Sequence, residues 1–374
     1  MRNKIFLVSL VLGSVLLFGS CKKMIKIVKV IFTDEQVDDE VVSGEEFDDK
    51  IEAAWKLRAS GNIEEGTRKI RELAEQGSGR AQYILGKAYF DGYGVESNEK
   101  LAEEWYAKSY ETNKKAAESG NAIDLTNLGI CYLYGYGVAK DKTKAFKLFM
   151  KAAEMGYSRA QSNVGFCYNA GDGVEQNSRE AIKWFQAAID QGYIEAYSGL
   201  GICYQYGYGV EPDPRKAIEY YKKGAEYFDD LSQYGIGICY YDGIGVEQDD
   251  NKAVKWFKKS ALQSNYAAMC MLGVCYFQNA GVEQDYNKAF ELAKKSAHGN
   301  YSPAINLIGV CYQEGKGVGK DEEKAVEYYT QAAKLNDVDG LNNLAKCYDF
   351  GIGVAQNKSK AQEYYDRAAA ISGQ

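Results

Sequence analysis

Seven cysteines stand at corresponding positions of a repeated pattern, and the thiol is the most reactive side chain in this sequence. A thiolate can attack a substrate or bind a metal, and two thiols can form a disulfide. These cysteines recur singly, without a paired cysteine or histidine in each repeat, so they make no ligand cluster. Corresponding positions of stacked helices lie about 8 to 10 Å apart, beyond the ~4.4 to 6.8 Å that a disulfide allows between Cα atoms. We therefore predict small apolar residues in a tight seam between helices, with metal binding as the minor alternative. The seven are Cys131, Cys167, Cys203, Cys239, Cys275, Cys311 and Cys347.

Two other sequence features resemble parts of a catalytic site. Ser97 and Lys100 have the spacing of a serine nucleophile with a lysine base, and His298 is the only histidine. Ser97 aligns with a loop position that holds Lys140 in the next repeat, and Asn98 aligns with a helix cap. A single surface imidazole makes neither a catalytic triad nor a metal site. We predict no catalytic residue, no metal site and no cofactor, so the chain is not expected to be an enzyme.

The cysteines belong to a repeat that governs most of the chain. A Gly-Val dipeptide recurs eight times, first after 43 residues and then at six successive intervals of 36. One tyrosine column and one alanine column keep the same spacing, which composition alone cannot produce. The glycines of the dipeptide are Gly94, Gly137, Gly173, Gly209, Gly245, Gly281, Gly317 and Gly353.

The residue pattern within each repeat predicts two helices. Apolar and small residues fall at helical spacings up to the tyrosine, and two glycines then break the first helix. An Asx residue follows, whose short acceptor side chain suits the N-cap of a second helix. That second helix carries an alanine and then a bulky pair such as Trp184 and Phe185, for which Leu292 and Ala293 are the weak copy. Small columns let the paired helices approach, while the aromatic columns fill the gap between repeats. The Asx residues are Asn98, Asp141, Asn177, Asp213, Asp249, Asp285, Asp321 and Asn357.

A hairpin of about 36 residues cannot bury both faces of its helices, so these units are stable only when stacked. The predicted fold is all-α, an α-α superhelical solenoid of about eight helix-hairpin repeats over residues 80–374. Residues 47–79 lack the glycine pattern and are expected to form a degenerate N-terminal capping pair of helices. The seven extra residues of the first interval lie between Ala102 and Gly120 and turn a helix by nearly two full turns, so they should lengthen it without rotating its buried face.

The N-terminus has the layout of an export signal. Arg2 and Lys4 precede an apolar run that ends in small residues just before Cys21, so residues 1–20 are predicted to be a signal peptide. Leu-Phe-Gly-Ser-Cys at 17–21 resembles a bacterial lipobox, which implies lipidation of Cys21 and attachment to a membrane of the bacterial cell envelope, facing the periplasm or the exterior. Residues 21–46 pass from a basic and apolar segment to an acidic linker. The basic segment either lies against anionic headgroups or packs onto the first repeat.

The net charge of -7, from 45 Lys and Arg against 52 Asp and Glu, gives no basic surface for nucleic acid.

The repeat resembles the Sel-one-like repeat, a relative of the tetratricopeptide repeat. The pattern Leu-Gly-x-x-Tyr-x-x-Gly-x-Gly-Val stands unbroken at residues 200–210, and the resemblance covers roughly residues 80–370 in eight copies. It implies a right-handed superhelix and an adaptor that binds a protein or peptide partner. Cysteine-rich relatives bridge two cysteines within each unit and include β-lactamase-like proteins, but Ala152 and Ala153 stand here where the second cysteine would be needed. A cell-wall or β-lactam hydrolase is thus one alternative, and a periplasmic ligand-sensing regulator is another.

In tetratricopeptide-like stacks the first helix of each unit lines the concave surface, where we expect the partner to bind. The expected surface is an aliphatic stripe bordered by amides, hydroxyls and rings, which suits an extended or helical peptide. The alternative is that the stripe packs as core against the partner helix. The candidate residues are Tyr83, Lys87, Phe90, Ile130, Leu133, Phe166, Asn169, Ile202, Gln205, Ile238, Tyr241, Val274, Phe277, Val310 and Gln313.

Overall fold

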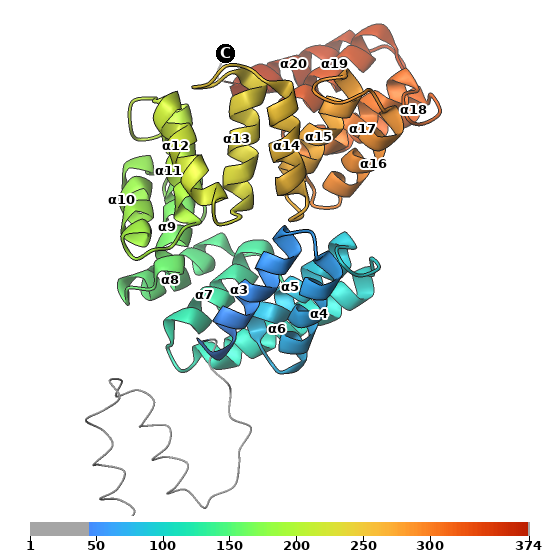
Figure 1. The fold of residues 1–374 in the computed structure, drawn as a ribbon. Helices are drawn as coiled ribbons and strands as arrows, with labels where there is room; N and C mark the ends of the chain where they lie inside the picture. The colour runs from blue at the N-terminus through green and yellow to red at the C-terminus, as the bar shows by residue number, and fades with distance from the viewer. Residues whose placement is uncertain (1–44, 373–374) are drawn as a thin grey trace, which may run out of the picture. The chain divides into compact units, whose positions relative to one another are not determined.

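The computed structural model describes residues 45–372, and over that range it contains eighteen helices and no strand (Figure 1). The predicted helical repeat solenoid is confirmed. The helices alternate between a first and a second helix of each unit and are connected by short turns. Their bounds are α3 (Glu45–Ala59), α4 (Ile63–Glu75), α5 (Gly79–Asp91), α6 (Glu99–Ala117), α7 (Ala122–Tyr134), α8 (Lys142–Glu154), α9 (Ser158–Ala170), α10 (Ser178–Asp190), α11 (Ala196–Tyr206), α12 (Pro214–Ala225), α13 (Asp230–Asp242), α14 (Asp250–Ala261), α15 (Tyr266–Gln278), α16 (Tyr286–Ala297), α17 (Ser302–Glu314), α18 (Glu322–Lys334), α19 (Val338–Phe350) and α20 (Lys358–Ser372).

The eight predicted Asx caps all begin a second helix. In each unit the side-chain oxygen of the Asx residue accepts a hydrogen bond from the backbone N–H three residues later, over 2.9 to 3.2 Å. These bonds satisfy a backbone donor that the helix itself leaves unpaired. The cap prediction is therefore confirmed in every repeat.

The glycine of each Gly-Val dipeptide is the point at which one unit touches the unit before it. Gly245 has a φ of +71°, and a Cβ placed there would lie 2.4 Å from the carbonyl oxygen of Pro214 in the first turn of α12. Gly173, Gly281 and Gly353 make the same approach to Lys142, Asp250 and Glu322. Both the left-handed conformation and the lack of space require glycine here.

A buried ring of the second helix fills the space between successive first helices. Phe185 is fully buried and packs against Gly165 of its own unit and Gly199 of the next. Tyr221 lies in the same way between Gly201 and Gly235. The prediction that the aromatic columns fill the gap between one repeat and the next is confirmed in these units.

The weak copy of the bulky pair changes this seam. Ala293 stands where other units have the buried ring, and the space beside Gly273 is filled instead by Leu307 and Leu292, each at ordinary contact distance from a Cβ built there. One unit thus uses aliphatic side chains from two helices to replace one ring.

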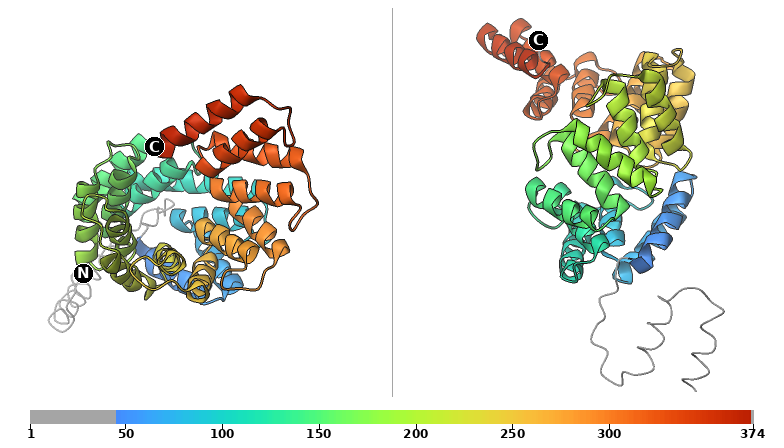
Figure 2. Two further views of the ribbon diagram at one scale, coloured as in Figure 1. Left: turned by 90° about the horizontal axis from the view of Figure 1, so that it is seen from above. Right: turned by 90° about the vertical axis from the view of Figure 1, so that its left-hand side faces the viewer.

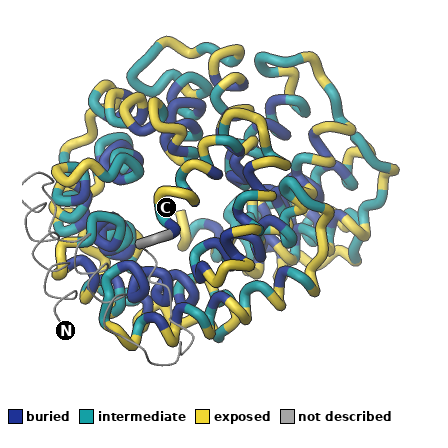
Figure 3. The backbone as a smooth tube through the Cα atoms, turned by 60° about the horizontal axis from the view of Figure 1, so that its bottom comes forward, coloured by how far each residue is buried: buried dark blue, intermediate teal, exposed yellow. Residues whose placement is uncertain are grey.

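The first helices form the inner layer of the stack. They contact one another from unit to unit, as α7 does with α9, α11 with α13 and α17 with α19, more than the second helices do. The helix pairs therefore turn progressively with the first helices on the concave side (Figure 2). Buried positions follow every helix pair along the stack and do not collect at one centre (Figure 3).

The seven-residue insertion lengthens α6 to 19 residues, where α8 has 13. Ala102, Ser109 and Ala116 are buried at intervals of seven along it, so its buried face keeps its direction, as predicted. Before the first repeat, α3 and α4 form a helix pair whose Ile51 and Ile70 are fully buried.

The export signal, Cys21 and the linker up to residue 44 lie outside the described residues, and the last two residues predicted for the linker begin α3. Among the helices of residues 45–372, none is long and apolar enough to cross a membrane.

Candidate functional site

The seven cysteines of the repeated column are buried in the seam between paired helices. Each is between 0% and 3% exposed and carries a free thiol. Burial raises the pKa of these thiols, to about 12 for Cys167 and Cys239, so they remain protonated and unreactive at neutral pH. Their backbone carbonyls accept the N–H of the residue that ends the first helix, such as Gly207 for Cys203. The column is structural, as the sequence predicted.

The serine and histidine candidates are also accounted for by local structure. Ser97 Oγ donates to the carbonyl oxygen of Phe90 over 3.2 Å in an exposed loop, and Asn98 is a helix cap. His298 is exposed, as expected, and its ring lies edge-on to Phe90 at 6.1 Å. Over residues 45–372 no group of three or more His, Cys, Asp or Glu side chains is placed to hold a metal ion.

The predicted aliphatic stripe lies between units. Ile130 is buried, and the other stripe residues are half-buried. Ile202 packs against the core around Tyr221 and Ile236, and Val310 packs against the core of the next helix pair in the same way. Each half-buried stripe residue thus has one side in a seam and one side exposed; the others of this kind are Phe166, Ile238 and Val274.

The residues one turn beyond the stripe are half-buried, and two of them serve buried tyrosines. Gln205 Oε1 accepts the hydroxyl of Tyr221 over 2.8 Å, and Gln313 Oε1 accepts the hydroxyl of Tyr329 over 2.7 Å. In the unit whose buried ring is Phe149, the position equivalent to Gln205 holds Leu133. Phe149 has no hydroxyl, so no hydrogen bond is needed there. Asn169, Tyr241 and Phe277 complete this column, and Tyr241 donates to Gln278 over 2.8 Å.

This pairing predicts a double-mutant cycle. Gln205→Leu strands the buried Tyr221 hydroxyl and should reduce the unfolding free energy by about 1–3 kcal/mol. Adding Tyr221→Phe recreates the leucine and phenylalanine combination of the unit that contains Leu133 and should recover most of that loss. Urea unfolding followed by circular dichroism measures both. Simple addition of the two single losses would contradict the pairing.

The first helices and the N-terminal hairpin enclose a cavity of about 220 Å³ on the inner side of the stack, which we call the inner cavity. Arg80 of α5 donates to Asp48 over 2.9 Å and to Glu52 over 2.7 Å, which joins α5 to α3. Arg159, at the start of α9, donates to the hydroxyl of Tyr83 over 2.7 Å and to the amide oxygen of Asn127 over 3.3 Å. Side chains 76 residues apart in the chain therefore meet at the inner cavity. Tyr83 is the one predicted site residue that lines it.

The facing wall of the inner cavity is acidic. Asp229 is 7% exposed and caps α13 through a 2.8 Å bond from the Ser232 N–H. Burial, followed by the neighbouring carboxylate of Asp230, raises the pKa of Asp229 to about 8. Burial also raises the pKa of Glu195, which lies at the start of α11.

A second set of contacts joins the first unit to later units of the stack. Tyr266, at the start of α15, donates its hydroxyl to the carboxylate of Asp91 at the end of α5, although 175 residues separate them. Lys87, a predicted site residue, lies over the Tyr266 ring at 5.2 Å, and Phe90 meets His298. The inner surface of the first unit is therefore partly covered by the later units.

The sequence reasoning did not single out Arg80, Arg159, Glu195 or Asp229. A signal was present, since Arg80, Arg159 and Glu195 occupy one column of the repeat at the start of the first helix. Tyr157, at the start of α9, provides no side-chain cap to its helix and points its hydroxyl to Asp48, 3.4 Å away. A helix start without a side-chain cap indicates that the residue there makes another contact instead.

The buried carboxyl of Asp229 predicts a pH-dependent stability. An ordinary aspartate ionises near 3.8, so between that pH and about 8 the folded chain binds more protons than the unfolded chain, and stability falls as pH rises. Asp229→Asn keeps the cap without the charge. We expect equal melting temperatures of the two proteins at pH 4 and a more stable variant at pH 8, by on the order of a few kcal/mol. Asp141→Asn, at an exposed cap, is the control. An offset that is the same at all pH values would contradict the assignment.

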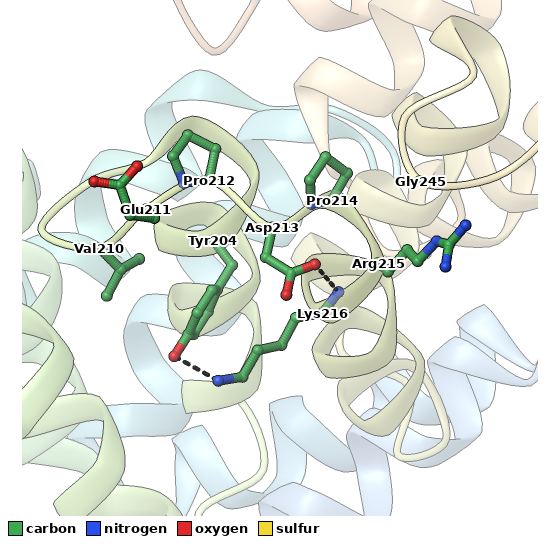
Figure 4. A pocket seen from close by; sticks show the side chains of 9 residues that line it. All are labelled: Tyr204, Val210, Glu211, Pro212, Asp213, Pro214, Arg215, Lys216 and Gly245. Atoms are coloured by element: carbon green, nitrogen blue, oxygen red, sulfur yellow. Dashed lines mark hydrogen bonds between the residues drawn. The ribbon is translucent and has the colours of Figure 1, made fainter.

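A larger and more open hollow of about 650 Å³ lies at the turn between α11 and α12 (Figure 4). Its side chains perform structural tasks. Asp213 caps α12, and Lys216 donates to the hydroxyl of Tyr204 over 2.7 Å while lying over its ring. The same lysine and tyrosine contact recurs in other units, as in Lys144 with Tyr132, so this hollow is a feature of the repeat and not a dedicated site.

Comparison with known proteins agrees with the repeat geometry. The Sel1 repeat model matches residues 79–111, 124–157, 158–193, 194–226, 230–265, 267–301, 302–337 and 338–371. A Sel1 repeat protein from Oxalobacter formigenes is 28% identical, with a TM-score of 0.53, over 67% of this chain and 100% of that one. A protective antigen of uropathogenic Escherichia coli with an SLR fold is 27% identical over 88% and 87% of the two chains, with a TM-score of 0.32. An immunity protein from Pseudomonas aeruginosa is 17% identical over 68% and 83%, with a TM-score of 0.35.

No curated protein sequence matches the chain. The eight matched segments nevertheless cover most of its length and coincide with the helix pairs from α5 to α20. The chain therefore belongs to the Sel1 repeat family.

Proposed function

We propose that this chain is a membrane-anchored scaffold of the bacterial cell envelope that binds a protein or peptide partner on its inner surface. Proteins of the Sel1 repeat family commonly serve as protein–protein interaction scaffolds and are generally not enzymes. The unreactive thiols and the structural tasks of Ser97 and Asn98 support a binding role over a hydrolytic one.

The observation that carries the proposal is the exposure of tyrosines at or just after the C-terminal ends of two first helices, α7 and α11. Tyr134, Tyr206 and Tyr208 are 57%, 56% and 41% exposed. Burial nevertheless raises the pKa of Tyr134 and of Tyr206, because surrounding protein limits the water around their hydroxyls. Tyrosines in such concave surroundings bury a large ring area and keep a polar end, which makes them frequent anchors of binding interfaces.

Site-specific photocrosslinking in the native envelope tests this proposal. A photoreactive residue at Tyr206 should trap a partner of defined mass, and the same partner should be trapped from Tyr134. Lys183, exposed on the outer helix α10, is the matched control position. Equal trapping from Lys183, or no defined product from either tyrosine, would contradict binding on the inner surface.

The membrane anchor is tested separately. The lipobox resemblance supports lipidation of Cys21, and Cys21→Ser should then move the protein from the membrane fraction to the soluble fraction without changing its helicity. Retention of the variant in the membrane would show that another segment anchors the chain. Hydrolysis of a chromogenic β-lactam by the purified protein would favour the enzyme alternative.

A further inference from the structure

The lining of the inner cavity includes Arg80 and Arg159 on one side and the carboxyl groups of Asp229 and Asp230 on the other, with Lys56 and Glu195 also present. On one wall, Arg80 is neutralised by Asp48 and Glu52. The guanidinium of Arg159 hydrogen-bonds the neutral side chains of Tyr83, Asn127 and Tyr157. A partly desolvated guanidinium without a carboxylate in direct contact is held at a cost in solvation, and an anion can recover that cost.

The other wall lacks a cation. Asp229 is buried and accepts from the Ser232 N–H, and Asp230 accepts from the amide of Asn265 over 2.8 Å. Within residues 45–372, neither carboxylate forms an ion pair with a basic side chain of the chain. Burial and the adjacent carboxylate of Asp230 raise the pKa of Asp229 to about 8, so Asp229 is mostly protonated at neutral pH, and an ammonium group between the two would favour its ionisation.

Glu195 is the lining carboxylate that interacts electrostatically with Arg159 and Arg80, but among the described residues no ion pair joins Arg159 to Asp229 or Asp230 across the cavity. Its volume of about 220 Å³ is room for roughly seven water molecules at ~30 Å³ each, which is less than the space of a drug-sized ligand. From these observations we propose that the inner cavity binds a small zwitterion of the dipeptide class, with its carboxylate at Arg159 and its ammonium group at Asp229 and Asp230. Tyr227 and Phe228, which also line the cavity and are exposed, provide apolar contact for ligand side chains.

Such a ligand would connect the start of α9 to the start of α13 and would strengthen the enclosure by α3 and α5. The proposal goes beyond the scaffold function, because it concerns a small molecule and a different set of residues from the exposed tyrosines.

Isothermal titration of the purified full-length protein in detergent tests the proposal. The probes are alanylalanine, alanyllysine and alanylglutamate, each with an N-acetylated and a C-amidated analogue. We expect saturable binding of at least one dipeptide and at least tenfold weaker binding of both of its analogues, since each lacks one charge. Arg159→Gln and Asp229→Asn should each weaken binding at least tenfold, and Arg179→Gln, on the exposed face of α10, should not.

Absence of binding by all three dipeptides would overturn the proposal, as would equal binding of the blocked analogues. Circular dichroism of Arg159→Gln and Asp229→Asn shows whether each variant is folded, and the analogue series on the wild-type protein remains decisive if one is not. The photocrosslinks from Tyr206 and Tyr134 do not depend on this result, so either proposal can fail without the other.

Discussion

Gly245→Ala should lower the free energy of unfolding by about 2–5 kcal/mol, because the alanine meets two penalties. The left-handed conformation at φ +71° costs a residue with a Cβ ~1–2 kcal/mol. The new Cβ would also lie 2.4 Å from the Pro214 carbonyl oxygen, and the strain of such overpacking adds ~1–3 kcal/mol. Urea unfolding followed by circular dichroism measures the loss.

Gly192→Ala is the matched control for this prediction. Gly192 also has a positive φ, of +82°, but no atom lies within 4 Å of a Cβ built there, so only the conformational penalty applies. The difference between the two variants isolates the contact between units. Equal losses of unfolding free energy would mean that Gly245 is needed for the conformation of its turn and not for the contact between repeats.

Phe257→Ala should cost about 3–5 kcal/mol, because it empties the space between α13 and α14. Phe257 is fully buried, and its ring lies directly against Gly237, which has no side chain to fill the cavity. Because the helix packing of a repeat is mainly with its neighbours, this loss should also weaken coupling along the stack, so that the single urea transition becomes broader or splits in two.

Phe350→Ala is the control for the phenylalanine deletion. Phe350 is 69% exposed at the end of α19, and its removal should change stability by less than about 0.5 kcal/mol. A small effect of Phe257→Ala would show that the seam collapses around the missing ring, as the seam beside Ala293 does with Leu307.

The sequence predicted the local structure because each helix cap and each packing seam lies within one or two repeats. The bond from Asp213 to the Lys216 N–H spans three residues, and the seam between Phe185 and Gly165 lies within one unit. The cap recurs in all eight repeats and the seam in most of them, so alignment of the chain's own repeats shows both. The direction of the buried face of α6 followed from the helical period alone.

The inner cavity could not be predicted in the same way. The contacts of Arg159 with Tyr83 and of Tyr266 with Asp91 join residues 76 and 175 positions apart. These contacts depend on the curvature of the stack. That curvature is the sum of small rotations between units and cannot be predicted from any one repeat. The contacts also occur once each, and the column that holds Arg80 and Arg159 does not show which side chains they meet. The role of Gln205 was missed for a related reason, since its partner Tyr221 lies on another helix.

The stripe of Ile202 and its equivalents shows the limit of position-based reasoning about a surface. Its residues face the inner side and also enter the seams, so groove and core are not exclusive descriptions of them. The exposed tyrosines at the ends of α7 and α11 are therefore better positions for testing partner binding.

The dependence of each unit on its neighbours is tested most directly by the helicity of one isolated repeat. A peptide of residues 230–265, which contains α13 and α14 with Phe257 and Gly237, should be largely unfolded by circular dichroism and should melt without cooperativity. The full chain should be strongly helical and melt cooperatively under the same conditions. A helical peptide with a cooperative transition of its own would contradict a fold that is held together by stacking.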